Sequence, residues 1–210
     1  RVFTLEEVTG LADFAQKHGL TLVSDELHSD LLLDGRHIPL ASLDHPVAAN
    51  VVTLYGPTKT FNIPGMHISF AICRNHDMLE KMKKTGAGLA TAPNILAQAA
   101  TLGAYGAGDA WLSEVLAYIR SNRDYLLERV ARTMPKVKVH KPAATYLAWF
   151  DLRAFDLGPK VSDTLAERAK VGVNEGAAFG AGGEGFVRFN FGTNRAVLDE
   201  ALTRLEQVLG

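Results

Sequence analysis

Short apolar runs alternate with helix-like segments along the first half of the chain. These runs are rich in β-branched residues and predict three strands, at 20–24, 51–54 and 68–73. Segment 5–18 is predicted to be a helix, because Thr4 and Glu7 form a capping box at its start and Gly19 follows its last residue. Strands of this kind, spaced by helices, indicate a buried parallel sheet with helices on its faces. The first half therefore predicts an α/β fold.

The pattern changes after Pro135. Before that point, segments 94–105 and 109–132 are predicted to be helices, and the longer one carries apolar residues along one side. Beyond it, three strands are predicted at 137–139, 146–150 and 186–191, and two helices at 163–170 and 195–209. Strands that turn back on themselves with helices to one side indicate a small α+β domain. We expect the boundary within or just after the long helix.

Composition narrows the class of protein. The 210 residues are 47% hydrophobic, which is ample for a packed core. The formal net charge is -1, from 22 basic and 23 acidic residues without a basic stripe, so nucleic acid is not an expected partner. No apolar run has the length of a membrane helix, so we expect no membrane partner. Cys73 is the single cysteine, which fits a reducing cytoplasm, and we expect no metal site.

The start of the chain carries its own expectation. Arg1 is not an initiator methionine, and the chain runs at once into the capping box of a helix. We therefore expect the sequence to be a fragment whose N-terminal part is missing.

Lys59 is the first candidate for chemistry. It follows the predicted strand 51–54, and Gly56, Pro57 and the Pro-Gly pair at 64–65 predict a turn or loop around it rather than a helix. A lysine held beside apolar side chains is suited to chemistry, because desolvation favours its neutral, nucleophilic amine. On spacing alone, a lysine in a surface turn is the commoner alternative.

Three more residues occupy suggestive positions. Asp25 ends the strand at 20–24, His28 follows three residues later, and Arg188 lies inside a predicted strand with Asn190 on the same side. In parallel sheets, ligands gather beyond the carboxyl ends of strands, where both Asp25 and Lys59 are expected. Each residue also has an ordinary alternative: a helix or turn cap for Asp25, a satisfied histidine for His28, and an edge-strand arginine with its head in water for Arg188. The glycine-rich stretch 176–185 is also open to interpretation as a mobile loop.

Three blocks together resemble a known family. They read Val-Ser-Asp-Glu-Leu-His-Ser-Asp at 23–30, Thr-Lys-Thr-Phe-Asn-Ile-Pro-Gly at 58–65, and Phe-Val-Arg-Phe-Asn-Phe-Gly at 186–192. Their order and wording resemble the fold-type I pyridoxal-phosphate enzymes, specifically the class I/II aminotransferases. The Asp-Glu-x-His and Lys-Thr-Phe-Asn-Ile wording resembles the cystathionine β-lyase-like (C–S lyase) branch. The resemblance spans the whole chain and covers the C-terminal half of a family member.

The resemblance implies a domain organisation. Residues 1–108 would be the C-terminal part of a large cofactor-binding domain with a mostly parallel sheet and flanking helices. Residues 109–210 would be a long connecting helix and a small α+β C-terminal domain. Family members are usually homodimers with active sites at the interface, so a homodimer is expected for the complete protein.

The resemblance also implies a role for each candidate residue. Lys59 would link covalently to pyridoxal 5'-phosphate and act as the catalytic base. Asp25 would pair with the pyridine nitrogen, His28 would lie near the phenolic oxygen, and Thr58 would give its hydroxyl to the phosphate. Arg188 would bind the substrate α-carboxylate through two parallel hydrogen bonds.

Two positions depart from the family pattern. Gly56 stands where members often have serine, three residues before the lysine, so a backbone N–H would have to replace that hydroxyl at the phosphate. Glu175 precedes Gly176 where many members carry a Pro-Gly pair.

The expected reaction is C–S β-elimination on a cysteine-derived amino acid such as cystathionine, which yields pyruvate, ammonia and a thiol. An aminotransferase that exchanges an amino group between an amino acid and a keto acid is the alternative, since the two reactions share their first steps. A non-catalytic regulatory or binding module is the alternative from another class. The isolated 210-residue chain is expected to be inactive, because the ring-stacking aromatic residue and the phosphate loop of the family would lie upstream of Arg1.

Overall fold

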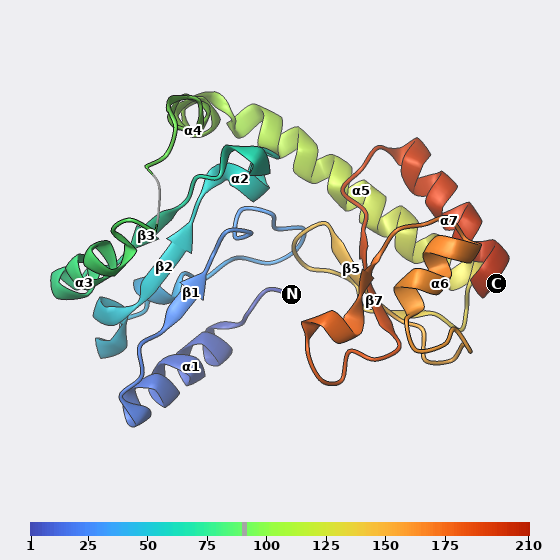
Figure 1. The fold of residues 1–210 in the computed structure, drawn as a ribbon, viewed down its shortest axis with the longest axis horizontal. Helices are drawn as coiled ribbons and strands as arrows, with labels where there is room; N and C mark the ends of the chain where they lie inside the picture. The colour runs from blue at the N-terminus through green and yellow to red at the C-terminus, as the bar shows by residue number, and fades with distance from the viewer. Residues whose placement is uncertain (90–91) are drawn as a thin grey trace. The chain divides into compact units, whose positions relative to one another are not determined.

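The computed structural model describes residues 1–89 and 92–210, which divide into two compact units, Arg1–Glu114 and Val115–Gly210 (Figure 1). The helix α5 (Asp109–Thr133) begins in the first unit and continues into the second. The assignment of 1–108 and 109–210 to two domains of a larger fold stays a prediction.

The first helix, α1 (Leu5–His18), has the predicted ends. The Glu7 amide donates to Thr4 Oγ1 at 3.2 Å, and the Thr4 amide donates to Glu7 Oε2 at 2.8 Å, which completes the capping box. Gly19 has φ 61°, a left-handed conformation that glycine adopts without strain. The predicted bounds of this helix are confirmed, because the signals that set them are local.

The sheet of the first unit is mixed. β1 (Val23–Asp25) pairs in parallel with β2 (Val52–Tyr55), as predicted. β3 (Phe70–Ile72) runs antiparallel to β2, so one of the two described strand pairings departs from the mostly parallel sheet that the resemblance implies. β3 lies at the edge of the described sheet, and its three residues are all exposed.

Helices and short turns connect these strands. The helical elements after β1 are the 3₁₀ segments Leu40–Ser42 and Pro46–Asn50, the turn α2 (Pro57–Thr60), the 3₁₀ segment Pro64–Met66, α3 (His76–Gly86) and α4 (Ile95–Ala107). Asn75 and Asn94 cap α3 and α4 by accepting a backbone N–H three residues on. α2 lies directly beyond the carboxyl end of β2 (Figure 1).

The second unit is an antiparallel sheet with helices packed on it. Its strand order is β4-β5-β7-β6, and the strands are Lys138–Val139, Leu147–Asp151, Phe186–Asn190 and Asn174–Glu175 in that order. Phe150 and Phe189 lie on the buried face and stack at 5.3 Å between ring centroids. The remaining elements are α6 (Val161–Arg168), the 3₁₀ segment Gly176–Phe179 and α7 (Arg195–Leu209). The predicted small α+β unit is therefore present.

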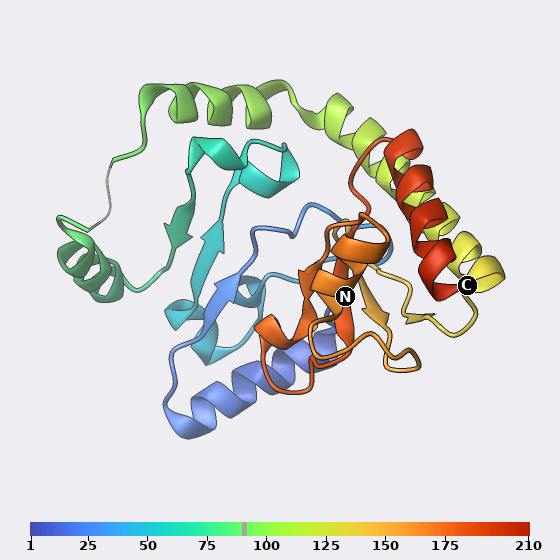
Figure 2. The same cartoon turned by 45° about the vertical axis from the view of Figure 1, so that its right-hand side comes forward.

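α7 runs alongside the C-terminal part of α5 in both views (Figures 1 and 2). Polar groups link the two helices. Arg129 of α5 donates to Asp199 at 2.7 Å and to Glu206 at 2.9 Å, both on α7. The fully buried Asn122 donates to the carbonyl oxygens of Phe191 and Thr193. These bonds fix the segment that follows β7 against α5.

Candidate active site

Asp25 and Lys59 belong to adjacent strand ends in the first unit. Asp25 is the last residue of β1, and its register partner on β2 is Leu54. The amide of Glu26 donates to the Leu54 carbonyl oxygen at 2.8 Å, which extends the pairing by one residue. Because β1 and β2 are parallel, Asp25 and the start of α2 lie at the same edge of the sheet. The predicted placement of both residues at strand ends is confirmed.

Lys59 lies on a single helical turn, α2, which corrects the expectation that no helix forms there. Pro57 occupies the first turn, where a missing N–H costs nothing and the fixed φ favours helix. Thr58 is 8% exposed, and Lys59 is half-buried. Among residues 1–89 and 92–210, the Lys59 amine has no hydrogen-bond or ion-pair partner.

Asp25 and His28 flank the start of the loop that follows β1. Oδ1 of Asp25 accepts the Leu27 amide at 3.2 Å, so the residue acts as a turn cap, as its ordinary alternative predicts. The Asp25 side chain is nevertheless exposed at the strand end, where its second carboxylate oxygen can meet a ligand. His28 is half-buried three residues further on.

Gly56 is closely packed. A Cβ atom there would lie 3.0 Å from the Ile68 carbonyl oxygen and 3.1 Å from Ser69 Cα, both backbone atoms. A serine side chain at this position would press against the backbone of residues 68–69, which would have to shift slightly. At this departure from the family pattern, the entry to α2 packs directly on residues 68–69.

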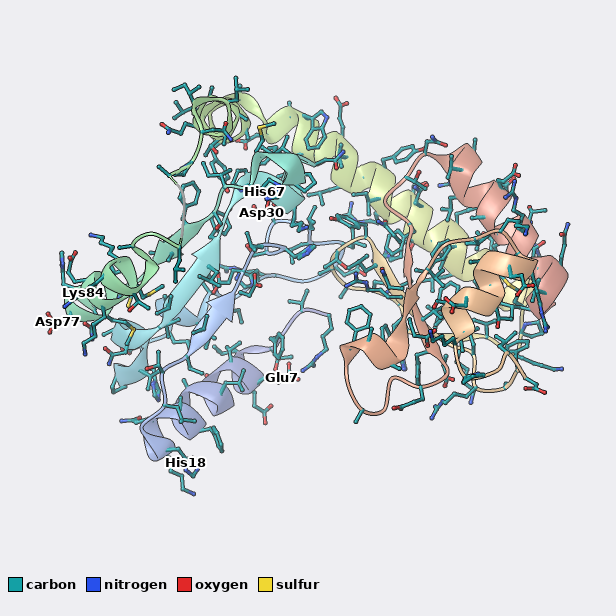
Figure 3. The ribbon with its side chains drawn as sticks, in the orientation of Figure 1. Glu7, His18, Asp30, His67, Asp77 and Lys84 are labelled. Carbon is teal, nitrogen blue, oxygen red and sulfur yellow. The ribbon has the colours of Figure 1, made fainter. Side chains whose placement is uncertain are left out.

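Asp30 contacts the Lys59 turn, although the sequence patterns did not single it out. Oδ2 of Asp30 accepts the Tyr55 hydroxyl at 2.8 Å and the Thr60 hydroxyl at 3.0 Å. Burial and the Asp30 carboxylate raise the pKa of Tyr55 well above its usual range. Figure 3 labels Asp30 beside α2. Its place in the block at 23–30 was the signal available in the sequence, but its partners lie 25 and 30 residues away.

Glu26 is a second buried carboxylate near β1. It is 6% exposed, and it accepts hydrogen bonds from Ser24 Oγ at 2.9 Å and His37 Nε2 at 2.8 Å. These two bonds satisfy the carboxylate and link the loop after β1 to residue 37. Glu26 is thus held away from solvent while its neighbour Asp25 is exposed.

Arg188 lies in the second unit, on the face of β7 opposite the buried core. Its Nη2 donates to Asn174 Oδ1 at 3.2 Å, and its guanidinium carbon lies 4.6 Å from the centroid of the Phe179 ring. Phe179 in turn packs edge-on against Trp149. Arg188 Nε is buried and has no hydrogen-bond partner within the described residues. A carboxylate is a suitable acceptor for a guanidinium N–H donor of this kind.

The glycine-rich stretch before β7 is packed at Gly176 and Gly183, whereas residues 177–182 between them are exposed. Cβ atoms added at Gly176 and Gly183 would each overlap backbone atoms of the other residue, so the two chain segments touch through bare backbone. Glu175 accepts the Ser162 amide at 2.8 Å and thereby caps the start of α6. The acidic residue at this departure from the family pattern thus has a structural role.

The structure thus brings four of the five candidate residues into one unit: Asp25, His28, Thr58 and Lys59. Arg188 belongs to the other unit. Asn174 and Phe179, which contact Arg188, were not predicted, because cross-strand and loop contacts are not visible in a sequence pattern.

No helix in the described ranges has the length and apolarity to cross a membrane. Among the same residues, no three His, Cys, Asp or Glu side chains gather in a way that suits a metal ion.

Comparison with known proteins agrees with the residue patterns. The family model for aminotransferase class I and II matches residues 1–205. The chain is 37% identical to cystathionine beta-lyase PatB of Bacillus subtilis over 217 residues, covering 100% of the chain and 55% of PatB. It is 30% identical to aromatic-amino-acid aminotransferase 2 of Thermococcus litoralis, covering 99% of the chain and 54% of that protein.

A solved structure shows the same fold. Cystalysin from Treponema denticola, whose crystal structure contains pyridoxal 5'-phosphate, matches with a TM-score of 0.93 at 32% identity. The match covers 100% of this chain and 54% of cystalysin. The chain spans about half the length of the curated relatives it matches. With its fold, its strand-end Asp25 and Lys59, and the family match over nearly all of its length, the chain belongs to the class I and II aminotransferase family.

Proposed function

We propose that the protein containing this chain is a pyridoxal 5'-phosphate-dependent C–S β-lyase that acts on a cysteine-derived amino acid. The products would be a thiol, pyruvate and ammonia. The observation that carries the proposal is the placement of Asp25 and the Lys59 turn at the same edge of two adjacent parallel strands. The lyase branch is supported by cystathionine beta-lyase PatB, which is 37% identical to the chain, against 30% for aromatic-amino-acid aminotransferase 2.

The residues of the first unit fit the cofactor. Asp25 supplies an exposed carboxylate for a protonated ring nitrogen, where opposite charges favour both ionised forms. Thr58 supplies a hydroxyl beside Lys59, and the Lys59 amine is available to bond to the cofactor aldehyde. When bound, pyridoxal 5'-phosphate supplies an electron sink for the electron pair left at the substrate Cα. His28 lies three residues from Asp25 and is assigned to the phenolic oxygen.

Arg188 and Lys59 have separate roles toward the substrate. Arg188 binds the α-carboxylate; its unpartnered Nε and its guanidinium plane, held by Phe179 and Asn174, favour a planar two-bond contact. Lys59 takes the proton from Cα as general base. The Cβ–S bond then breaks, and the electron pair leaves with sulfur as a thiolate, which a proton converts to the thiol. The three-carbon remainder leaves as an enamine, and water hydrolyses its imine form to pyruvate and ammonia.

An aminotransferase is the second candidate, because a relative with that name is 30% identical. It would use the same residues for carboxylate binding and for removal of the Cα proton. The two candidates differ in the next step. In an aminotransferase, Lys59 would deliver the proton to a different atom, whereas in a lyase the thiolate would leave from Cβ. The two candidates therefore differ in products and not in the residues described above.

The test uses the full-length protein with cystathionine and, separately, with an amino acid and a keto acid. We expect pyruvate and ammonia from cystathionine, and no release after Lys59→Ala. Lys17→Ala is the matched control, since Lys17 is an exposed lysine at the end of α1. Keto-acid exchange without pyruvate would establish the aminotransferase instead. Absence of both reactions, with no cofactor bound, would support a non-catalytic module.

We further propose that the complete protein is a homodimer that works in the cytoplasm on small amino-acid substrates. The support is the family membership and the near-neutral composition with one cysteine. Light scattering of the purified full-length protein measures the oligomeric state, and a monomer that turns over cystathionine would contradict the dimer.

A further inference from the structure

The Lys59 turn is too short to be stable by itself. α2 has four residues, and its backbone bonds are the Phe61 amide to the Pro57 carbonyl at 2.9 Å and the Ile63 amide to the Thr58 carbonyl at 3.0 Å. The first turn of a helix fixes several backbone angles for one hydrogen bond, so a lone turn is unfavourable in water. Contacts from elsewhere in the unit must therefore hold α2 in shape.

One carboxylate oxygen accepts hydrogen bonds from residues on both sides of Lys59 in the chain. Asp30 Oδ2 accepts the hydroxyl of Tyr55, the last residue of β2, and that of Thr60, the last residue of α2. Lys59 lies between these two donors in the chain. Thr60 is 2% exposed, so loss of its acceptor would leave a buried hydroxyl without a partner. Figure 3 shows Asp30 beside the turn.

The hydroxyl groups of Tyr55 and Thr60 form strong hydrogen bonds to Asp30. Bonds to an ionised carboxylate are stronger than those between neutral groups. The pKa of Tyr55 is raised by burial and by Asp30, so its hydroxyl keeps its proton, and remains a donor, through neutral and mildly alkaline pH. The Tyr55 ring also stacks on Tyr105 of α4, with 6.0 Å between centroids.

Aromatic packing holds the other side of the turn. The ring of Phe61 contacts Tyr105 edge-on at 5.7 Å and stacks on Trp111 at 5.9 Å. It also lies over Gly108, where an added Cβ would overlap the ring. This packing restricts the end of the turn, whereas the two bonds to Asp30 tie the last residue of β2 and the last residue of α2 to the loop after β1.

We propose that Asp30 is a positioning residue, which fixes the helical turn that presents the Lys59 amine by accepting hydrogen bonds from Tyr55 and Thr60. Its importance for catalysis rests on the proposed function, but its effect on the turn does not. Without Asp30, the turn samples other conformations, and the Lys59 amine spends less time in the orientation that reacts.

The experiment compares variants of the full-length protein. Asp30→Ala removes the acceptor, and the double variant Tyr55→Phe with Thr60→Val removes the two donors. Asp13→Ala is the matched control, because Asp13 is a carboxylate of the same unit whose bond is to His45 at 3.2 Å. If Asp30 acts through its two donors, the double variant reproduces the effect of Asp30→Ala.

Two measurements report on the conformation of α2. The first is hydrogen exchange at the amides of Phe61 and Ile63, which needs no cofactor. The second is the rate at which pyridoxal 5'-phosphate and borohydride label Lys59, relative to the other lysines by peptide mass. We expect at least tenfold faster exchange and about tenfold slower labelling for Asp30→Ala, with both rates unchanged for Asp13→Ala.

The outcomes separate this inference from the proposed function. Unchanged exchange at Phe61 and Ile63 in both Asp30→Ala and the double variant would overturn the positioning role. Equal changes in Asp13→Ala would also overturn it, since they would reflect general loosening. Failure of the wild-type protein to label at Lys59 or to release pyruvate would contradict the proposed function, and the exchange result would still decide the role of Asp30.

Discussion

Asn122 should be one of the most sensitive positions in the second unit. Its side chain is fully buried on α5 and makes three hydrogen bonds. The amide nitrogen donates to the carbonyl oxygens of Phe191 at 3.2 Å and Thr193 at 2.7 Å, and the amide oxygen accepts from Arg195 Nε at 2.9 Å. Asn122→Ala removes all three bonds at the connection between β7 and α7.

The expected cost follows from the burial of each partner. The Phe191 carbonyl is buried with Asn122, so leaving it without a donor costs about 1–3 kcal/mol. The Thr193 carbonyl and the Arg195 guanidinium are part-buried and can regain water, so each loss costs about 1 kcal/mol. The total is about 3–5 kcal/mol, a large share of the roughly 5–15 kcal/mol that stabilises a typical domain.

Urea unfolding followed by fluorescence measures this loss. Trp149 stacks on Phe186 in the second unit, and a Trp111→Phe background makes it the only tryptophan of this chain. With a urea slope of about 1–3 kcal/mol/M, Asn122→Ala should lower the midpoint by at least about 1 M. Ser121→Ala is the control, because it removes only the exposed bond from Arg195 and should cost under about 1 kcal/mol. Equal midpoints for the two variants would refute this reasoning.

Three further predictions concern stability. Gly176→Ala should destabilise the second unit by about 3 kcal/mol in urea unfolding, since its methyl group would overlap backbone atoms, whereas Gly172→Ala, with nothing within 4 Å, should stay within about 1 kcal/mol of wild type. Thr4→Ala should cost about 1 kcal/mol, seen as faster amide exchange in the first turn of α1, and an unchanged rate would contradict the capping role. Hydrogen bonds from Arg153 lower the pKa of Asp151 from 3.8 to about 2, so its stabilisation is complete above pH 3.8 and is lost as the pH falls towards 2; a stability difference from Asp151→Asn that does not shrink over this range would refute the assignment.

Much of the fold could be predicted where the signals are local. The ends of α1 follow from Thr4, Glu7 and Gly19, all within one turn of the helix end that they mark. The direction of β3 could not be predicted, because an apolar run predicts a strand and not its orientation. Pro57 beside Gly56 predicts a loop, although proline is also favoured in the first turn of a helix, which is what forms.

In the candidate site too, features set by local sequence could be predicted and contacts between distant residues could not. The strand-end positions of Asp25 and Lys59 follow from reading where each apolar run stops. The bonds from Asp30 to Tyr55 and Thr60 join residues 25 and 30 positions apart, and only the pairing of β1 with β2 brings them together. The positions of Asp25 and Lys59 could be predicted from the sequence, whereas the contacts that Asp30 makes around Lys59 required the structure.

The contact between Gly176 and Gly183 restricts how this protein can evolve. A clash between two side chains can be relieved by making either one smaller. Here any side chain at one position meets the main chain of the other, which no second substitution can shorten. Compensating substitutions therefore cannot replace this pair of glycines. Variation in the stretch before β7 must come from the residues around the two glycines or from a loop of different length or conformation.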